Sequence, residues 1–177
     1  MIVYKYNIVN VTKTESDTSE KSSGIRGAFS PAFLLAQVGA HAAAKFAERL
    51  ETIGLVPAHA GVLRLVQASE GLSQQALGLE LRVLPSRLVV LIDELEKIGL
   101  IERRDHPSDR RSHALYLTDK GRETMKAVGR LAREHQDVLC AALNEKERAQ
   151  LASLLQRIAE DQGLRLGVHP GFSRLRP

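Results

Sequence analysis

Tryptophan is absent from the sequence, and only 4% of the residues are aromatic. So few aromatic residues, together with 44% hydrophobic residues, suit helices packed through Leu, Ala, Val and Ile better than a β-sandwich. The length of 177 residues is that of one domain or compact subunit with a sizeable core. The composition therefore argues against an all-β fold.

Cysteine occurs once, at Cys140. A single thiol excludes an intramolecular disulfide and a cysteine zinc site, so a reducing cytoplasm is the expected compartment. No apolar run approaches the roughly 20 residues of a transmembrane helix, and the first residues lack the pattern of a signal peptide. We therefore expect a soluble, cytoplasmic protein without a membrane partner.

The motifs of common enzyme classes are missing as well. There is no Gly-rich phosphate loop, no nucleophile elbow and no spaced set of carboxylates or Cys and His residues. The sequence therefore predicts no enzyme, no cofactor and no metal site. Its 25 Lys and Arg against 21 Asp and Glu give a formal charge of +4, which permits an anionic partner without requiring one.

The two ends of the chain differ from its middle. Residues 1–29 combine an apolar start with the polar run TKTESDTSEKSSG, which cannot bury enough surface to stay folded and predicts a mobile arm. This arm is either an extension without function or, over residues 2–11, a strand that packs on a partner. Residues 164–177 are expected to form a C-terminal tail.

A long amphipathic helix is predicted to begin at Ser30 and Pro31, an N-cap followed by a first-turn proline. Its apolar residues recur at spacings of three and four: Leu35, Val38, Ala42, Phe46, Leu50 and Ile53. Gly54 ends this helix, and Pro57 begins a short buried helix that ends before Gly71.

A helix-turn-helix is predicted next. Ser73 caps a short helix over residues 74–81, and Pro85 begins a second helix. One face of that helix is apolar: Leu84, Leu88, Leu91, Ile92, Leu95 and Ile98. Residues 100–104 and 112–117 then flank a polar turn and predict a two-stranded hairpin. A helix-turn-helix followed by a hairpin is a winged helix.

Two further amphipathic helices follow. Thr118 caps a helix that reaches about Leu143, and Asn144 with Glu147 resembles a capping box that begins a last helix ending near residue 162. Apolar faces beyond the needs of a winged helix occur in three segments: 31–53, 119–143 and 145–162. Packing against a second subunit is the simplest way to bury them, and a monomeric helical cap is the alternative.

Several stretches share the order and spacing of one family's motifs. They are Gly71-Leu72-Ser73-Gln74-Gln75, Val83-Leu84-Pro85-Ser86-Arg87, residues 91–104, Asp109-Arg110-Arg111-Ser112 and Leu117-Thr118-Asp119-Lys120-Gly121. The last two match a wing pattern of Asp, any residue, Arg, then Leu-Thr-x-x-Gly. Over residues 31–162 the chain resembles the MarR (multiple antibiotic resistance regulator) family.

The resemblance implies a homodimeric, DNA-binding repressor or activator. Its fold would be mainly α with a small β-hairpin wing. The winged helix-turn-helix would cover residues 57–118, and residues 30–56 and 119–163 would form the dimerisation helices. The two winged helices of the dimer would then bind one pseudo-palindromic duplex, at half-sites roughly 34 to 36 Å apart.

The helix that begins at Pro85 is the expected recognition helix. Its amino end offers free N–H groups and a positive dipole end to a major groove, and an arginine there can contact guanine O6 and N7. The resemblance assigns Ser86 and Arg87 to this role, although a surface arginine can also be merely solvated. Expected phosphate contacts come from the start of the preceding helix, at Ser73, Gln74 and Gln75.

The hairpin carries the arginines Arg103, Arg104, Arg110 and Arg111. A narrow minor groove concentrates negative potential and attracts arginine. By family analogy, Asp109 pairs with a nearby arginine and braces the wing, while Arg111 enters the groove. Arg103 and Arg104 are either phosphate contacts or charges at the strand edge.

The recognition helix departs from the family pattern in two ways. Arg82 occupies a turn position that often carries glycine, so we expect a strained or reshaped turn. Val89 and Val90 replace residues that are often polar, which indicates either contact with a thymine methyl or few direct base contacts. Acidic residues later in the helix, Asp93, Glu94 and Glu96, would have to face away from phosphate.

The resemblance also implies a small aromatic or lipophilic effector at the junction of the dimerisation helices and the winged helix. His41 and His59 are the candidate lining residues, and no pair of histidines has the i, i+4 spacing of a helical zinc site. For Cys140 a buried, inert thiol is favoured over a redox switch. The alternative function is a winged helix that binds protein, which has no need of wing arginines.

Overall fold

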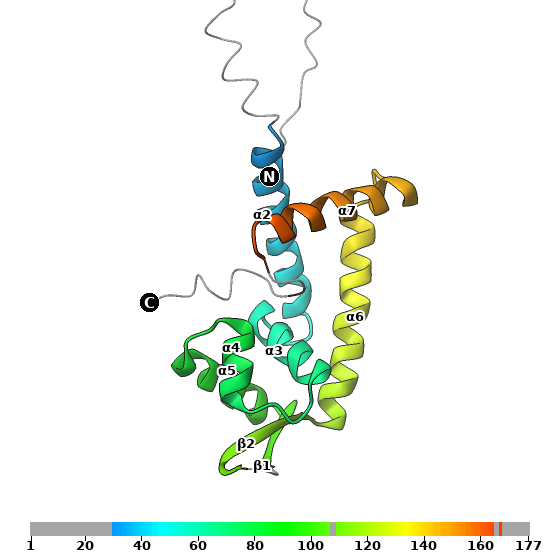
Figure 1. The fold of residues 1–177 in the computed structure, drawn as a ribbon. Helices are drawn as coiled ribbons and strands as arrows, with labels where there is room; N and C mark the ends of the chain where they lie inside the picture. The colour runs from blue at the N-terminus through cyan, green and yellow to red at the C-terminus, as the bar shows by residue number, and fades with distance from the viewer. Residues whose placement is uncertain (1–29, 107–108, 165–166, 168–177) are drawn as a thin grey trace, which may run out of the picture. The chain divides into compact units, whose positions relative to one another are not determined.

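The structure is a computed structural model that describes residues 30–106, 109–164 and 167. Its elements are α2 (Pro31–Glu51), α3 (Pro57–Ala68), α4 (Gln74–Leu81), α5 (Pro85–Lys97), β1 (Ile101–His106), β2 (Asp109–Leu117), α6 (Asp119–Leu139) and α7 (Glu145–Asp161) (Figure 1). The arm predicted at residues 1–29 and most of the predicted tail lie outside the described residues. None of the described helices is long and apolar enough to cross a membrane.

The chain divides into two compact units, Met1–His41 and Ala42–Pro177. In the first unit, the described residues form the beginning of α2. The Ser30 hydroxyl accepts a hydrogen bond from the Phe33 N–H at 3.3 Å, which confirms the predicted helix start. Large apolar side chains are exposed along this segment: Phe33, Leu34, Leu35 and Val38.

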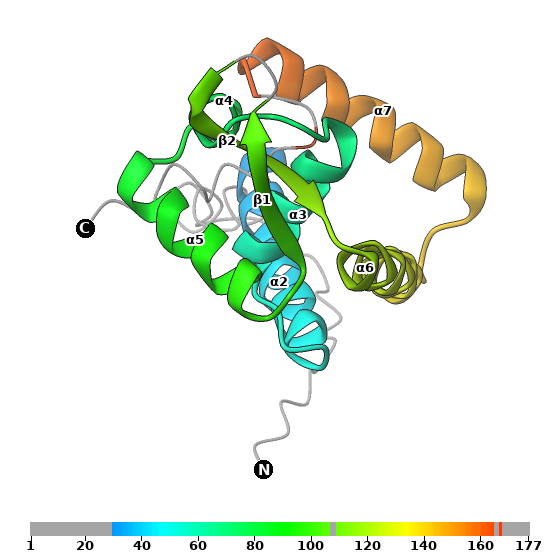
Figure 2. The same cartoon turned by 90° about the horizontal axis from the view of Figure 1, so that it is seen from below.

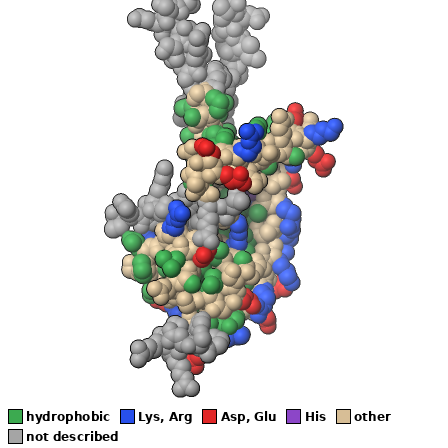
Figure 3. Space-filling model, viewed as in Figure 1, with side chains coloured by type: hydrophobic (Ala, Val, Ile, Leu, Met, Phe, Trp, Pro, Cys, Tyr) green, Lys and Arg blue, Asp and Glu red, His purple; other side chains and the backbone are tan. Residues whose placement is uncertain are grey.

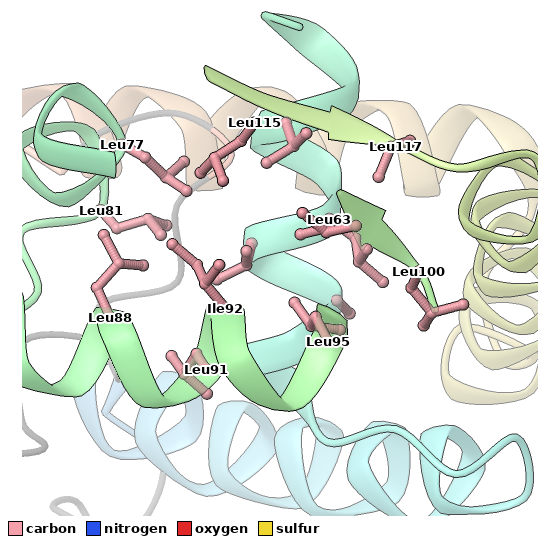
Figure 4. Packing of buried hydrophobic residues seen from close by; sticks show 14 of the residues in the cluster. Leu63, Leu77, Leu81, Leu88, Leu91, Ile92, Leu95, Leu100, Leu115 and Leu117 are labelled. Atoms are coloured by element: carbon pink, nitrogen blue, oxygen red, sulfur yellow. The ribbon is translucent and has the colours of Figure 1, made fainter. Parts of the chain in front are cut away.

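The second unit has one hydrophobic core, which α3, α4, α5 and the hairpin enclose. Figure 4 shows leucines of these elements pointing toward one another, among them Leu63 of α3, Leu77 of α4 and Leu115 of β2. From α5, the residues Leu88, Leu91, Ile92 and Leu95 are buried, whereas Leu84 and Ile98 at its two ends are exposed. Each buried leucine contributes about 1.5–3 kcal/mol. The apolar pattern therefore fixes which side of α5 faces inward.

Three more of the predicted helix starts are confirmed by their caps. The Ser73 hydroxyl accepts from the Ala76 N–H at 3.2 Å, and the Thr118 hydroxyl accepts from the Gly121 N–H at 3.0 Å. At α7, Asn144 and Glu147 exchange side-chain and backbone hydrogen bonds in a complete capping box. These bonds satisfy N–H groups that have no partner within a helix.

The turn between α4 and α5 is strained, as predicted. Arg82 has φ 53° and ψ 40°, the left-handed conformation that glycine adopts without cost. Among the described residues it is the one non-glycine residue with positive φ.

The hairpin is longer than predicted. β1 continues to His106 and β2 begins at Asp109, so the polar residues expected to form the turn belong largely to the antiparallel ladder. Backbone pairing accounts for this difference, because the ladder bonds N–H and C=O groups whatever the side chains. The hairpin lies between α5 and α6, as Figure 2 shows.

The end of α6 also differs from the prediction. The helix ends at Leu139 instead of Leu143. The Arg148 Nε of α7 donates to the carbonyl oxygens of Cys140 and Leu143, at 3.1 and 3.0 Å. These carbonyls therefore have a partner outside the helix, which permits the chain to turn here.

Candidate nucleic-acid interface

The start of α4 is joined to the hairpin. Leu72 and Leu115 are linked by a hydrogen bond from the Leu115 N–H to the Leu72 carbonyl at 3.0 Å, and Ser73 forms a β-bridge with Ala114. Ser73 and Gln74 are half-buried, and Gln75 is exposed. Because this end of α4 is hydrogen-bonded to β2, the predicted phosphate-contacting residues are held next to the wing.

The N-terminus of α5 lies open at the surface. No side chain caps it, and Leu84, Pro85, Ser86 and Arg87 are all exposed. Arg87 forms no ion pair with any residue of the described chain. The Arg87 N–H donates to the Leu84 carbonyl at 3.0 Å, and Pro85 has no N–H, so Ser86 carries the backbone N–H of this first turn without a partner among the described residues. A helix start with such an N–H, a positive dipole end and a guanidinium without an ion pair can receive an anion or a base edge.

The outward face of α5 begins as an apolar surface. Ser86 and Val90 point away from the buried leucines, since successive residues turn by 100° around a helix axis. Val89 is 37% and Val90 53% exposed. Figure 3 shows hydrophobic side chains gathered over α4 and α5, near the left edge of the view. The exposed valine side chains can make apolar contacts at this surface, which charged side chains cannot make.

Every carboxylate of α5 is ion-paired. Arg103 of β1 uses its two terminal nitrogens to contact Asp93 and Glu96. His59 of α3 contacts Glu94, with 2.8 Å between Nε2 and Oε2. The sequence pattern predicts only that these acidic residues face away from phosphate, and it does not predict their partners.

Arg104 makes a separate set of contacts on the hairpin. Its Nε donates to Glu102 at 2.8 Å, and its guanidinium lies 4.4 Å from the centre of the Tyr116 ring. The same ring approaches Gly71, where a Cβ atom would lie 3.1 Å from the tyrosine hydroxyl. Arg104 is thus fixed within the hairpin, away from α5.

The wing tip is described only in its backbone. Asp109, Arg110 and Arg111 belong to β2, and Asp109 pairs with His106 across the ladder. Their side chains lie outside the described part of the chain. The proposed bracing by Asp109 and the groove contact by Arg111 therefore remain predictions.

The predicted effector residues fall in different units of the chain. His41 is exposed in the first unit, and His59 is largely buried in the second, with its side chain 12% exposed. The Nδ1 atom of His59 is buried without a hydrogen-bond partner among the described residues. The described residues contain no group of His, Cys, Asp or Glu side chains that could hold a metal ion. Cys140 is partly buried.

Sequence reasoning missed the pairing of Arg103 with α5. Arg103 follows Glu96 by seven residues and Asp93 by ten, and a turn of chain and a change of element separate them. Helical and strand periods relate residues within one element, whereas Asp93 and Glu96 lie in α5 and Arg103 lies in β1. Only the placement of β1 against α5 reveals the contact.

Comparisons with known proteins agree with this architecture. The sequence model of the MarR family matches residues 55–113. A protein of Thauera aromatica, named for transcriptional regulation of the hcr operon, is 32% identical over 115 residues, which are 64% of this chain and 69% of that protein.

Solved structures extend the likeness beyond the matched segment. The transcriptional repressor CouR, bound to a 23-mer DNA duplex, has a TM-score of 0.66 and 34% identity, and the match covers 82% of this chain and 99% of that one. Wild-type MarR from E. coli has a TM-score of 0.65 and 23% identity, covering 73% and 97%. The second likeness concerns the fold alone. The mainly helical winged helix with flanking helices, together with these sequence relationships, shows that the chain belongs to the MarR family of transcriptional regulators.

Proposed function

We propose that this regulator is a repressor that binds a pseudo-palindromic DNA operator as a homodimer. The observation that carries the proposal is the uncapped, exposed start of α5, where Arg87 has no ion-pair partner among the described residues. A relative with 34% identity supports it, because that chain is a repressor bound to a DNA duplex.

In this proposal α5 enters the major groove. Ser86 and Arg87 face base edges, and Ser73, Gln74 and Gln75 contact phosphate at the start of α4. The wing approaches the adjacent minor groove, where Arg111 enters, Arg110 contacts the DNA beside it and Asp109 pairs with a nearby arginine.

Exposed apolar side chains outside the winged helix support the homodimer. They are Val138 and Leu139 of α6 and Leu151, Leu154, Leu155 and Ile158 of α7. Exposed apolar side chains that gather on one helix face, as on α7, are typical of a protein interface. A two-fold dimer would present two α5 helices at half-sites roughly 34 to 36 Å apart.

We also propose that a small aromatic or lipophilic effector releases the DNA. Such a molecule changes binding only if it has unequal affinity for the two forms of the dimer. His41 and His59 remain the candidate lining residues of this proposal. A panel of aromatic carboxylates, added to the preformed DNA complex, tests this part of the proposal through the DNA affinity.

The alternative is a winged helix that binds another protein. Enrichment of DNA sites from a random duplex pool separates the two functions. The proposed function predicts enriched sites with inverted repeats at the spacing of one helical turn, whereas a protein-binding module enriches no sequence.

Variants then locate the DNA-contacting surface. Arg87→Ala should lower affinity for the enriched site by about 1–3 kcal/mol and relax its base preference. Arg111→Ala should weaken binding markedly, since it removes the guanidinium proposed to enter the minor groove. Arg130→Ala is the matched control, because it removes the same charge from the exposed surface of α6. Equal, small losses in all these variants would contradict the assigned surface.

A further inference from the structure

The second half of α5 is acidic, although this helix is the proposed DNA reader. The helix carries Asp93, Glu94 and Glu96 against Arg87 and Lys97. A carboxylate held close to the phosphates of a duplex repels them, and unit charges interact strongly over short distances. DNA binding through α5 therefore requires that these charges be offset.

Arg103 offsets two of them from the neighbouring strand. One of its terminal nitrogens contacts Asp93 and the other contacts Glu96. Its side chain is 21% exposed, compared with 57% for Arg104 on the same strand. The guanidinium fork is thus turned toward α5, and its two terminal nitrogens are occupied.

The contacts of Arg103 with Asp93 and Glu96 contribute little to the stability of the fold. Asp93 and Glu96 remain 56% and 40% exposed, and ion pairs with exposed partners contribute little to folding. Their electrostatic effect is larger than their effect on stability, because they offset negative charge on the surface that is proposed to meet DNA. A planar guanidinium can bridge two carboxylates at once, whereas a lysine ammonium is a single point charge.

We infer that Arg103 is a positioning residue for DNA binding, which neutralises Asp93 and Glu96 and fixes the base of the wing to α5 without contacting DNA itself. The inference rests on the proposed function, and it separates Arg103 from the other wing arginines. It replaces the expectation of a direct phosphate contact with an indirect role.

A double-mutant cycle tests this role. Affinity for the enriched duplex is measured for the wild type, Arg103→Ala, the pair Asp93→Asn with Glu96→Gln, and all three changes together. Arg103→Ala should weaken binding about tenfold in the wild-type background, because it exposes the phosphates to two unneutralised carboxylates. In the Asn/Gln background the same change should cost less than about twofold, since neither of the carboxylates that Arg103 contacts remains.

A phosphate contact would give another pattern. Arg103→Ala would then cost the same factor in both backgrounds, and the slope of log affinity against log salt would fall by about 0.9 in each. Equal losses with a lower slope would overturn the inference. Arg103→Lys adds a check, because one ammonium cannot bridge both carboxylates and should recover only part of the affinity.

Arg104→Ala is the matched control in the same cycle. Arg104 contacts Glu102 and Tyr116 instead of α5, so its loss should be equal in the two backgrounds. Thermal unfolding and sedimentation confirm that each variant is folded and keeps the wild-type oligomeric state. If Arg103→Ala does not fold, Arg103→Gln takes its place.

The outcomes distinguish this inference from the proposed function. Wild-type protein that does not prefer the enriched duplex to a scrambled one overturns the proposed function and the inference with it. Normal wild-type preference with no difference between the two backgrounds overturns only the role of Arg103.

Discussion

Arg82 occupies a backbone conformation that costs an ordinary residue about 1–2 kcal/mol. Arg82→Gly should therefore raise the free energy of unfolding by about 0.5–1 kcal/mol, after the larger chain entropy of unfolded glycine is subtracted. Urea unfolding measures the change. Arg82→Ala keeps the strain and should give no gain, and equal gains from both substitutions would show that the turn is unstrained.

Val90 gives a second prediction at this scale. Its exposed methyl groups on α5 match the thymine methyl group of a major groove, whereas they offer no hydrogen bond to a base. Replacing the contacted thymine of an enriched site with uracil should cost about 0.8 kcal/mol, the value of one buried methylene-sized group. Thymines outside the footprint are the control. Affinity that is insensitive to every such replacement would favour a recognition helix with few direct base contacts.

At the scale of elements, α6 begins against the end of α5. The Thr118 hydroxyl donates to the Gly99 carbonyl at 2.7 Å, and Lys120 Nζ donates to the Ile98 carbonyl at 2.7 Å. A Cβ atom at Gly121 would lie 2.1 Å from the carbonyl oxygen of Leu100. The helix that leaves the wing is therefore packed directly on the segment that follows α5.

Gly121→Ala should destabilise the fold because the added methyl group meets a backbone oxygen. We expect the free energy of unfolding to fall by about 2 kcal/mol or more, since overpacking a core costs about 1–3 kcal/mol and occasionally more. Gly129→Ala on the same helix is the control, since its Cβ would meet nothing closer than a side-chain nitrogen at 3.7 Å. It should stabilise α6 by about 0.5–1 kcal/mol. A neutral Gly121→Ala in thermal unfolding would contradict this packing.

Local patterns predicted the elements well where the determining interactions are local. Ser73, Thr118 and Asn144 identified helix starts because a cap acts within three residues of its helix. The hairpin was predicted too short, because ladder pairing does not depend on the polarity of its side chains. The contacts of Arg103 with α5 were not predicted at all, because they depend on how separate elements pack.

At the scale of the whole molecule, the proposed homodimer explains why α7 exposes apolar residues. Leu151, Leu154, Leu155 and Ile158 recur at spacings of three and four and share one face of the helix. In a single chain this face remains in water. A second subunit would bury it and gain the corresponding hydrophobic free energy.

Leu154→Glu should therefore dissociate the dimer without unfolding the winged helix, because a buried charge without a partner is costly. Sedimentation measures the subunit association, and circular dichroism checks the helix content. Ser153→Glu is the matched control, since it adds the same charge on the opposite face of α7. Wild-type association of Leu154→Glu would show that this face does not form the interface.

The central claim is that this chain reads DNA, and a salt titration of binding to an enriched duplex tests it most directly, with a scrambled duplex of equal length as the control. The account predicts tighter binding to the enriched duplex. It also predicts that log affinity falls linearly and steeply with log salt, because each neutralised phosphate releases counterions. Equal affinity for both duplexes, or an affinity that salt leaves unchanged, would contradict it.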